Sequence, residues 1–282
     1  MYVTVNGARL YFDVEGAGLV PDGPRMHEKP TLLLLHGGPG FDHTMYKLAF
    51  SALADIAQVI YLDQRGQGRS TGEPETWTLA QWGDDVKGFC DALGIEKPIV
   101  YGGSFGGFVA QAYATRHPAH PGKLILASTC AKVVYDDIIA AFERIGGKGA
   151  RDAAAAYWLA PTMESRIKYL ETCLPFYNTR APSDPDALKR AILKHEVGLV
   201  FNGPNNEQGR MDFRADLGRV QCPTLVVAGD RDPMVPMSLT QTLVSCLPPQ
   251  LVRFERFENC GHGVQRDDPE KAFRIIREFI LS

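Results

Sequence analysis

The chain has 282 residues, of which 45% are hydrophobic and 22% are charged, a composition typical of globular proteins rather than disordered or fibrous ones. Its 30 Lys and Arg residues against 33 Asp and Glu residues give a formal net charge of −3 without a basic block, which argues against a nucleic-acid partner. Without a signal peptide, a membrane-length apolar run of about 18 residues, or a Cys-x-x-Cys pair, the chain is expected to be one soluble, cytoplasmic domain with reduced thiols.

Short apolar runs recur along the chain at the spacing of an alternating strand and helix fold. Residues 2–5 and 9–14 alternate apolar and polar side chains around Asn6-Gly7, a dipeptide that favours hairpin turns. A Gly- and Pro-rich loop is expected at 16–29, and runs that predict buried strands follow at 31–35, 59–62, 99–101, 124–127 and 225–228. Helices are expected at 79–93, 105–116 and 269–281. The alternation predicts an α/β fold with a mostly parallel central sheet and helices on both faces.

Residues 131–217 interrupt this alternation. They are rich in Ala and other helix-favouring residues, with breaks at Pro161, Pro175 and Pro182. An insertion after one strand of an α/β sheet usually lies above the carboxyl ends of the strands, where ligands bind. The sequence therefore predicts a core of residues 1–130 and 218–282 and a helical cap, or lid, of residues 131–217.

A candidate nucleophile lies between the predicted strand at 99–101 and the helix that follows it. Gly102–Gly106 fits the pattern Gly-x-Ser-x-Gly around Ser104. In a strand-to-helix elbow the serine occupies a strained turn, and small residues are needed on both sides because a side chain there would collide with the neighbouring backbone. A plain glycine-rich turn is the alternative, but the flanking strand and helix favour a nucleophile.

A serine hydroxyl needs a base within hydrogen-bond reach before it becomes a good nucleophile. His262 is the best candidate among the seven histidines, because it lies late in the chain on a Gly-flanked loop after a strand-like run. Two carboxylates, Asp230 and Asp232, follow the predicted strand at 225–228 and could orient this histidine. Asp230 could instead cap its turn or pair with Arg231.

Acyl transfer also requires donors for the developing oxyanion. His36–Gly40 is a glycine-rich loop after the first buried strand, and we expect the backbone N–H groups of Gly38 and Phe105 to be the donors. His36 itself is expected to support the loop. A phosphate-binding loop is the alternative, but the segment has no Gly-Lys-Ser/Thr.

The turn Asp63–Ser70 resembles a dinucleotide fingerprint only superficially, because Gly66 and Gly68 are followed by Gly72 rather than by a glycine at position 71. We expect a structural turn with Asp63 and Arg65 in a salt bridge or in hydrogen bonds. The sequence therefore predicts neither a cofactor nor a metal ion.

Taken together, His36–Gly40, the Asp63–Ser70 turn and Gly102–Gly107 resemble the proline iminopeptidase (prolyl aminopeptidase) family of α/β-hydrolases, over nearly the whole chain. The resemblance implies a serine hydrolase that removes an N-terminal residue, often proline, from a short peptide. It also implies that Asp232, rather than Asp230, orients the histidine.

The chain departs from this family where the family binds the substrate's ammonium group. Pro233 occupies a position where one subgroup has glutamate, and Asn206 occupies another glutamate site, with Glu207 beside it as the candidate substrate-binding acid. The alternatives are a carboxylesterase, lactonase or amidase acting on a small uncharged acyl compound, or a ligand receptor on a hydrolase fold. Such receptors typically lose a catalytic residue or the oxyanion loop, whereas this chain keeps them.

Overall fold

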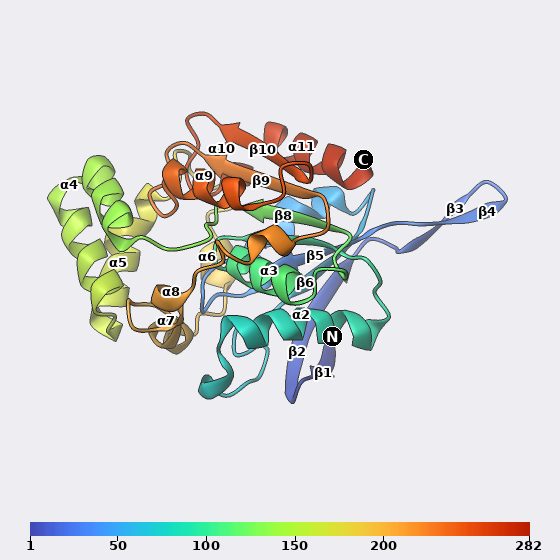
Figure 1. Ribbon diagram of the computed structural model, residues 1–282, viewed down its shortest axis with the longest axis horizontal. Coiled ribbons are helices and arrows are strands. Elements are labelled where there is room, and N and C mark those ends of the chain that lie inside the picture. The colour runs from blue at the N-terminus through green and yellow to red at the C-terminus, as the bar shows by residue number, and fades with distance from the viewer.

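The computed structural model describes residues 1–282 and is built around one eight-stranded sheet (Figure 1). The strands of this sheet are β1 (Tyr2–Val5), β2 (Ala8–Glu15), β5 (Thr31–Leu35), β6 (Gln58–Leu62), β7 (Ile99–Gly103), β8 (Lys123–Ala127), β9 (Thr224–Gly229) and β10 (Val252–Phe257). They lie in the order β1-β2-β6-β5-β7-β8-β9-β10; the pairs β1–β2 and β2–β6 are antiparallel and the other pairs are parallel. The α/β fold class predicted from the sequence is confirmed.

Helices connect the strands and cover the sheet. They are α1 (Lys47–Phe50), α2 (Leu79–Leu93), α3 (Phe105–Arg116), α9 (Met237–Cys246), α10 (Val264–Asp267) and α11 (Pro269–Leu281), with short 3-10 turns η1 (His43–Tyr46), η2 (Ser51–Leu53), η3 (Pro74–Thr76) and η5 (Leu217–Arg219). No helix of the structure combines the length and the apolarity that a crossing of the bilayer would require.

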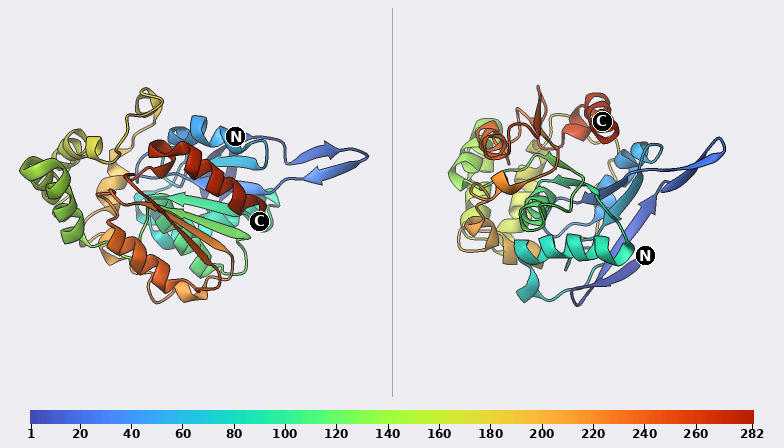
Figure 2. Two further views of the ribbon diagram at one scale, coloured as in Figure 1. Left: turned by 90° about the horizontal axis from the view of Figure 1, so that it is seen from above. Right: turned by 45° about the vertical axis from the view of Figure 1, so that its right-hand side comes forward.

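The central strands are apolar along their length because helices pack on both faces of the sheet. In β5, Leu33 and Leu35 belong to one hydrophobic core with side chains of α2, α3 and α9. Leu32 and Leu34 belong to a second core with side chains of α1 and α11. Figure 2 shows α2 and α11 on opposite sides of the sheet. Alternate residues of a strand point to opposite faces, so a run of consecutive leucines fits a strand buried on both.

A small hairpin replaces the loop expected at residues 16–29. Strands β3 (Leu19–Asp22) and β4 (Arg25–Glu28) pair with each other only, and they extend from the body of the molecule (Figures 1 and 2). Asp22 pairs with Arg25 across the two-residue turn, where Gly23 has a φ of +57°. The Gly and Pro residues that indicated an irregular loop therefore make the tight turn of a hairpin.

Five helices lie between β8 and β9: α4 (Tyr135–Leu159), α5 (Met163–Cys173), α6 (Ala187–Arg190), α7 (His195–Phe201) and α8 (Glu207–Arg210). Pro161 falls between α4 and α5, and Thr162 caps α5 in a reciprocal capping box with Ser165. The aromatic residues Trp158 and Tyr169 are buried between these two helices. Figure 2 shows α4 and α5 at one end of the molecule, beyond the ends of the strands.

Candidate active site

Ser104 occupies the turn between β7 and α3. Its backbone lies at φ +54° and ψ −119°, a conformation that costs energy for a residue with a side chain and is typical of a nucleophile elbow. A Cβ atom on Gly102 would collide with the carbonyl oxygen of Gly106, and one on Gly106 would collide with the carbonyl oxygen of Leu35. The two glycines of the motif are therefore needed for close backbone packing, as the sequence analysis expected.

Asp232 and His262 form a hydrogen-bonded pair. The Nδ1 atom of His262 lies 2.8 Å from Oδ2 of Asp232, whose side chain is completely buried. The second carboxylate oxygen, Oδ1, accepts hydrogen bonds from the backbone N–H groups of Met234 (2.8 Å) and Val235 (3.0 Å). A carboxylate in this position favours the tautomer with the proton on Nδ1, which leaves the lone pair of Nε2 available as a base.

Asp230 has other partners. Its carboxylate accepts a hydrogen bond from the backbone N–H of Asn259 at 2.8 Å and pairs with Arg256 at 3.1 Å. Asp230 therefore joins its turn to the loop after β10 instead of capping the turn, and its ion pair is with Arg256 and not with Arg231. Arg256 lies on β10, the strand beside β9, so sheet pairing decides this partner.

The order of the strands brings Ser104, Asp232 and His262 to one edge of the sheet. Ser104 follows β7, Asp232 follows β9 and His262 follows β10, and these parallel strands occupy one half of the sheet with only β8 between β7 and β9. The carboxyl ends of parallel strands are the usual position of ligand sites in such sheets. No direct hydrogen bond joins Ser104 to His262 in this structure; such bonds are often long in unliganded enzymes and tighten when substrate binds.

The glycine-rich loop after β5 lies against the serine. A Cβ atom on Gly37 would be 3.6 Å from the Cβ atom of Ser104, and Gly38 lines the same cavity as Ser104. Phe105 is the first residue of α3, where backbone N–H groups have no partner within the helix. The backbone N–H of Gly40 donates to the side chain of Gln67 at 2.7 Å, which holds the loop.

The conformation of this loop is supported by His36, as expected. Its Nε2 atom accepts from the backbone N–H of Gln64 at 3.3 Å, and the Gln64 side chain donates to the carbonyl oxygen of His36 at 2.9 Å. Burial lowers the pKa of the His36 imidazole. The ring is therefore kept neutral and acts as a hydrogen-bond acceptor beneath the loop.

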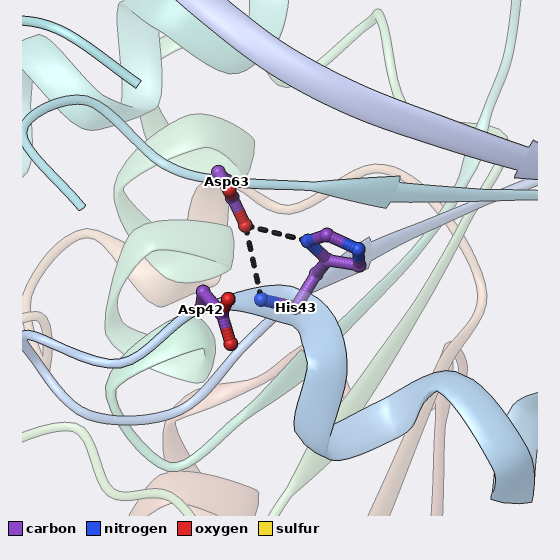
Figure 3. Close-up of side chains that lie close together, drawn as sticks. All are labelled: Asp42, His43 and Asp63. Atoms are coloured by element: carbon purple, nitrogen blue, oxygen red, sulfur yellow. Dashed lines mark hydrogen bonds and ion pairs between the residues drawn. The ribbon is translucent and has the colours of Figure 1, made fainter. Parts of the chain in front are cut away.

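A buried cluster of Asp42, His43 and Asp63 joins the start of η1 to the turn after β6 (Figure 3). Asp63 accepts hydrogen bonds from the ring of His43 at 2.7 Å and from the backbone N–H of Arg69 at 2.8 Å; Asp42 accepts from Arg69 at 3.1 Å and from Thr44. Burial by itself would raise the pKa of Asp63, but the hydrogen bonds from His43 and Arg69 hold it below its ordinary value. Since every carboxylate oxygen already has a protein donor, the geometry is that of a hydrogen-bonded brace.

The prediction that Arg65 pairs with Asp63 was wrong. Its guanidinium pairs with Asp85 of α2, at 2.6 and 2.8 Å, and not with Asp63, which binds His43 and Arg69. Both Arg65 and Asp85 are buried. The turn is therefore fastened to α2 by an ion pair between residues 20 positions apart.

Ser104 opens on a small cavity with an apolar wall. The volume of this cavity is about 20 Å³, which is room for about one water molecule. The lining residues are Gly38, Ser104, Phe108, Cys130, Val133, Ile138, Trp158, Gln208, Met234 and Val235. Ile138 and Trp158 belong to α4 and Gln208 to α8, so helices between β8 and β9 form part of the wall. A wider surface hollow on α5 is lined by that helix alone.

Glu207, the acid expected to bind substrate, is not among the residues that line this cavity. Its carboxylate accepts a hydrogen bond from the backbone N–H of Leu79 at 3.0 Å, at the start of α2, and pairs with Arg210 at 3.3 Å. The neighbouring Gln208 lines the cavity instead. Gln208 could not be predicted from the sequence, because no motif surrounds it and the choice between adjacent residues depends on the orientation of one short helix.

A second residue without a sequence signal is Asp267, which is completely buried behind the histidine loop. Its carboxylate accepts three backbone N–H groups, from Gly261 (2.7 Å), Thr179 (2.9 Å) and Arg180 (3.1 Å). Gly261 precedes His262, whose own N–H donates to the carbonyl oxygen of Tyr177. The residues after α5 and the loop that carries His262 are therefore tied together by one carboxylate.

Comparison with known proteins agrees with this geometry. The family model described as the alpha/beta hydrolase fold matches residues 30–269, which include the glycine-rich loop, Ser104, Asp232 and His262. The chain belongs to the α/β-hydrolase fold family.

Relatives within this family support the resemblance to proline iminopeptidases. The chain is 28% identical to the proline iminopeptidase PfmaB of Pestalotiopsis fici, with 99% of this chain and 98% of the relative covered. It is 25% identical to the 3-oxoadipate enol-lactonase 1 of Acinetobacter baylyi, with 90% of each covered. The structure of the proline iminopeptidase of Mycobacterium smegmatis superposes with a TM-score of 0.76 at 24% identity, covering 100% of this chain and 97% of that one. This α/β-hydrolase is thus similar both to a peptidase and to a lactonase.

Proposed function

We propose that this α/β-hydrolase is a serine hydrolase that cleaves an amide or ester bond through an acyl-enzyme. The observation that carries the proposal is the buried Asp232–His262 pair at the same edge of the sheet as the strained elbow of Ser104. A buried carboxylate on Nδ1, a free Nε2 and a serine on an elbow are the groups that nucleophilic acyl transfer needs.

The proposed reaction assigns a step to each residue. Oγ of Ser104 attacks the carbonyl carbon while Nε2 of His262 takes the hydroxyl proton, and the resulting imidazolium is stabilised by Asp232. The tetrahedral oxyanion accepts hydrogen bonds from the backbone N–H groups of Gly38 and Phe105. When the intermediate collapses, the leaving alcohol or amine takes the proton from His262. Water then attacks the acyl-enzyme by the same route and releases the acid and Ser104.

The walls of the cavity favour an uncharged acyl group. Seven of its ten lining residues are hydrophobic and none is acidic, and Glu207 is engaged with Leu79 and Arg210. A buried ammonium group without a charge partner would keep its desolvation cost uncompensated. We therefore favour a small ester, lactone or amide as substrate. An N-terminal aminopeptidase, with a short peptide as substrate, is the second candidate because of the likeness to the iminopeptidase of Pestalotiopsis fici.

The helices of residues 131–217 are proposed to be the lid, since α4 and α8 contribute walls to the cavity beside Ser104. A cavity with room for about one water requires these walls to move, or their side chains to rearrange, before a substrate enters. All six cysteines are free and five of them are buried, which is consistent with the proposed cytoplasmic location.

The mechanism is tested by Ser104→Ala, with the exposed Ser238→Ala as the matched control. Ser104→Ala should abolish labelling by a fluorophosphonate and lower hydrolysis by a factor on the order of 10⁴ to 10⁶, whereas Ser238→Ala should leave both unchanged. Wild-type turnover by Ser104→Ala would contradict the mechanism.

The substrate class is tested by comparing kcat/KM for proline arylamide, its N-acetylated form and a short-chain aryl ester on one preparation. We expect the ester or the acetylated amide to be at least competitive with the free amine. A preference for the free proline arylamide of more than about 100-fold, roughly 2.7 kcal/mol, would establish the aminopeptidase instead. Both outcomes leave the role of Ser104 intact.

A further inference from the structure

Gln208 is a largely buried residue whose side-chain amide has no hydrogen-bond partner. Only 4% of the residue is exposed, it lines the cavity at Ser104, and its carboxamide forms none of the side-chain hydrogen bonds found in the structure. The amides of two nearby residues behave differently: the Asn202 side chain donates to the hydroxyl of Tyr157, and that of Asn206 donates to the carbonyl oxygen of Leu199. Neither polar atom of the Gln208 side chain is fully buried, so the unpaired carboxamide is accessible and free to bind a ligand in the cavity.

The rest of the wall offers a ligand almost no other polar contact. Besides Ser104 and the thiol of Cys130, only the carboxamide of Gln208 and the indole N–H of Trp158 are polar side-chain groups of the lining residues, and neither an acidic nor a basic side chain lines the cavity. In a pocket of this kind, a few well-placed polar groups set the orientation and specificity of the ligand while the apolar wall contributes burial.

We propose that Gln208 is a substrate-binding residue that selects substrates carrying an uncharged hydrogen-bonding group, an amide or a hydroxyl, close to the bond that Ser104 attacks. A carboxamide both donates and accepts hydrogen bonds but carries no charge, so it pairs with such a group and leaves an ammonium or carboxylate uncompensated. An alkyl substrate of the same shape leaves the carboxamide unpaired, and sites of this type discriminate strongly against it. The inference rests on the proposed serine hydrolase and names its substrate class.

The test uses three p-nitrophenyl esters: the N-acetylglycinate, whose acyl chain carries an amide, the pentanoate, its alkyl counterpart, and the glycinate, which carries a free amine. Each is measured with the wild type, Gln208→Leu, Gln208→Glu and Gln241→Leu, in which the same replacement is made at an exposed glutamine of α9. Comparing each variant with the wild type on one ester cancels the intrinsic reactivity of that ester, so the ratios report binding in the transition state.

Gln208→Leu should lower kcat/KM for the N-acetylglycinate roughly 10- to 100-fold more than for the pentanoate. Gln208→Glu should shift the preference toward the glycinate, because a carboxylate compensates the ammonium. Gln241→Leu should change no ratio. Equal effects of Gln208→Leu on the N-acetylglycinate and the pentanoate would overturn the role of Gln208, while hydrolysis that still depends on Ser104 would leave the proposed function standing. Loss of dependence on Ser104 would overturn both.

Discussion

Replacing Asp267 by Asn tests whether one buried carboxylate positions the loop that carries His262. Asp267 accepts backbone N–H groups from Gly261, Thr179 and Arg180. An asparagine keeps one acceptor oxygen and turns an NH₂ group toward the remaining backbone N–H groups. One or two of the three bonds must therefore break, and each bond to a charged acceptor contributes about 1.5–3 kcal/mol.

We expect the free energy of unfolding of Asp267→Asn to fall by about 2–4 kcal/mol. We also expect kcat to fall by roughly 10- to 100-fold with little change in KM, because a misplacement of about 1 Å in a catalytic group has a cost of this size while the cavity wall stays intact. Urea unfolding measures the first quantity. Steady-state hydrolysis of an aryl ester, at a temperature where the variant is fully folded, measures the second.

Asp268→Asn is the matched control. Asp268 is the N-cap of α11 and accepts the backbone N–H of Lys271 at 3.2 Å, and asparagine is about as good an N-cap. The control should therefore keep both stability and activity. If Asp267→Asn were destabilised but kept a kcat within about twofold of the wild type, Asp267 would be a structural residue only, and the inference that it positions His262 would fail.

Three further predictions concern the proposed catalytic residues and two buried groups. Asp232→Asn should lower kcat by about 10³- to 10⁴-fold because the histidine tautomer is lost, while Asp230→Asn should alter kcat little; the reverse pattern in the same assay would exchange their roles. The pKa of His36 is lowered by burial from its ordinary 6.5, so only the unfolded chain takes up this proton as the pH falls below 6.5, and the native state loses stability. His36→Gln should therefore show a smaller loss of unfolding free energy between about pH 7.5 and 5.5 than the wild type, and an equal or larger loss would contradict this. Burial raises the pKa of Cys130 to about 12, so iodoacetamide at about pH 8 should leave activity intact while a phosphonate inactivates the enzyme; inactivation with alkylation of Cys130 would argue against a protonated thiol.

Local sequence patterns were sufficient to predict the fold class and to single out Ser104 and His262 as candidates, whereas the choice of Asp232 over Asp230 depended on the family resemblance. Continuous apolar runs such as Leu32–Leu35 require a strand covered on both faces, and the glycines around Ser104 require close backbone packing. These signals are local because they arise from the preferences of a few neighbouring residues. The hairpin of β3 and β4 was missed because Gly and Pro favour both a loop and a tight turn.

Only the tertiary structure decided which buried polar groups meet. Arg65 pairs with Asp85 and not with Asp63, because the packing of α2 places a carboxylate beside it. Glu207, the candidate substrate-binding acid, gave a similar result: it accepts a hydrogen bond from Leu79, a residue 128 positions away, and Gln208 lines the cavity instead. Hydrogen bonds are short and directional, so a rotation of one short helix is enough to exchange the roles of adjacent side chains, and no pattern within a single segment contains that rotation.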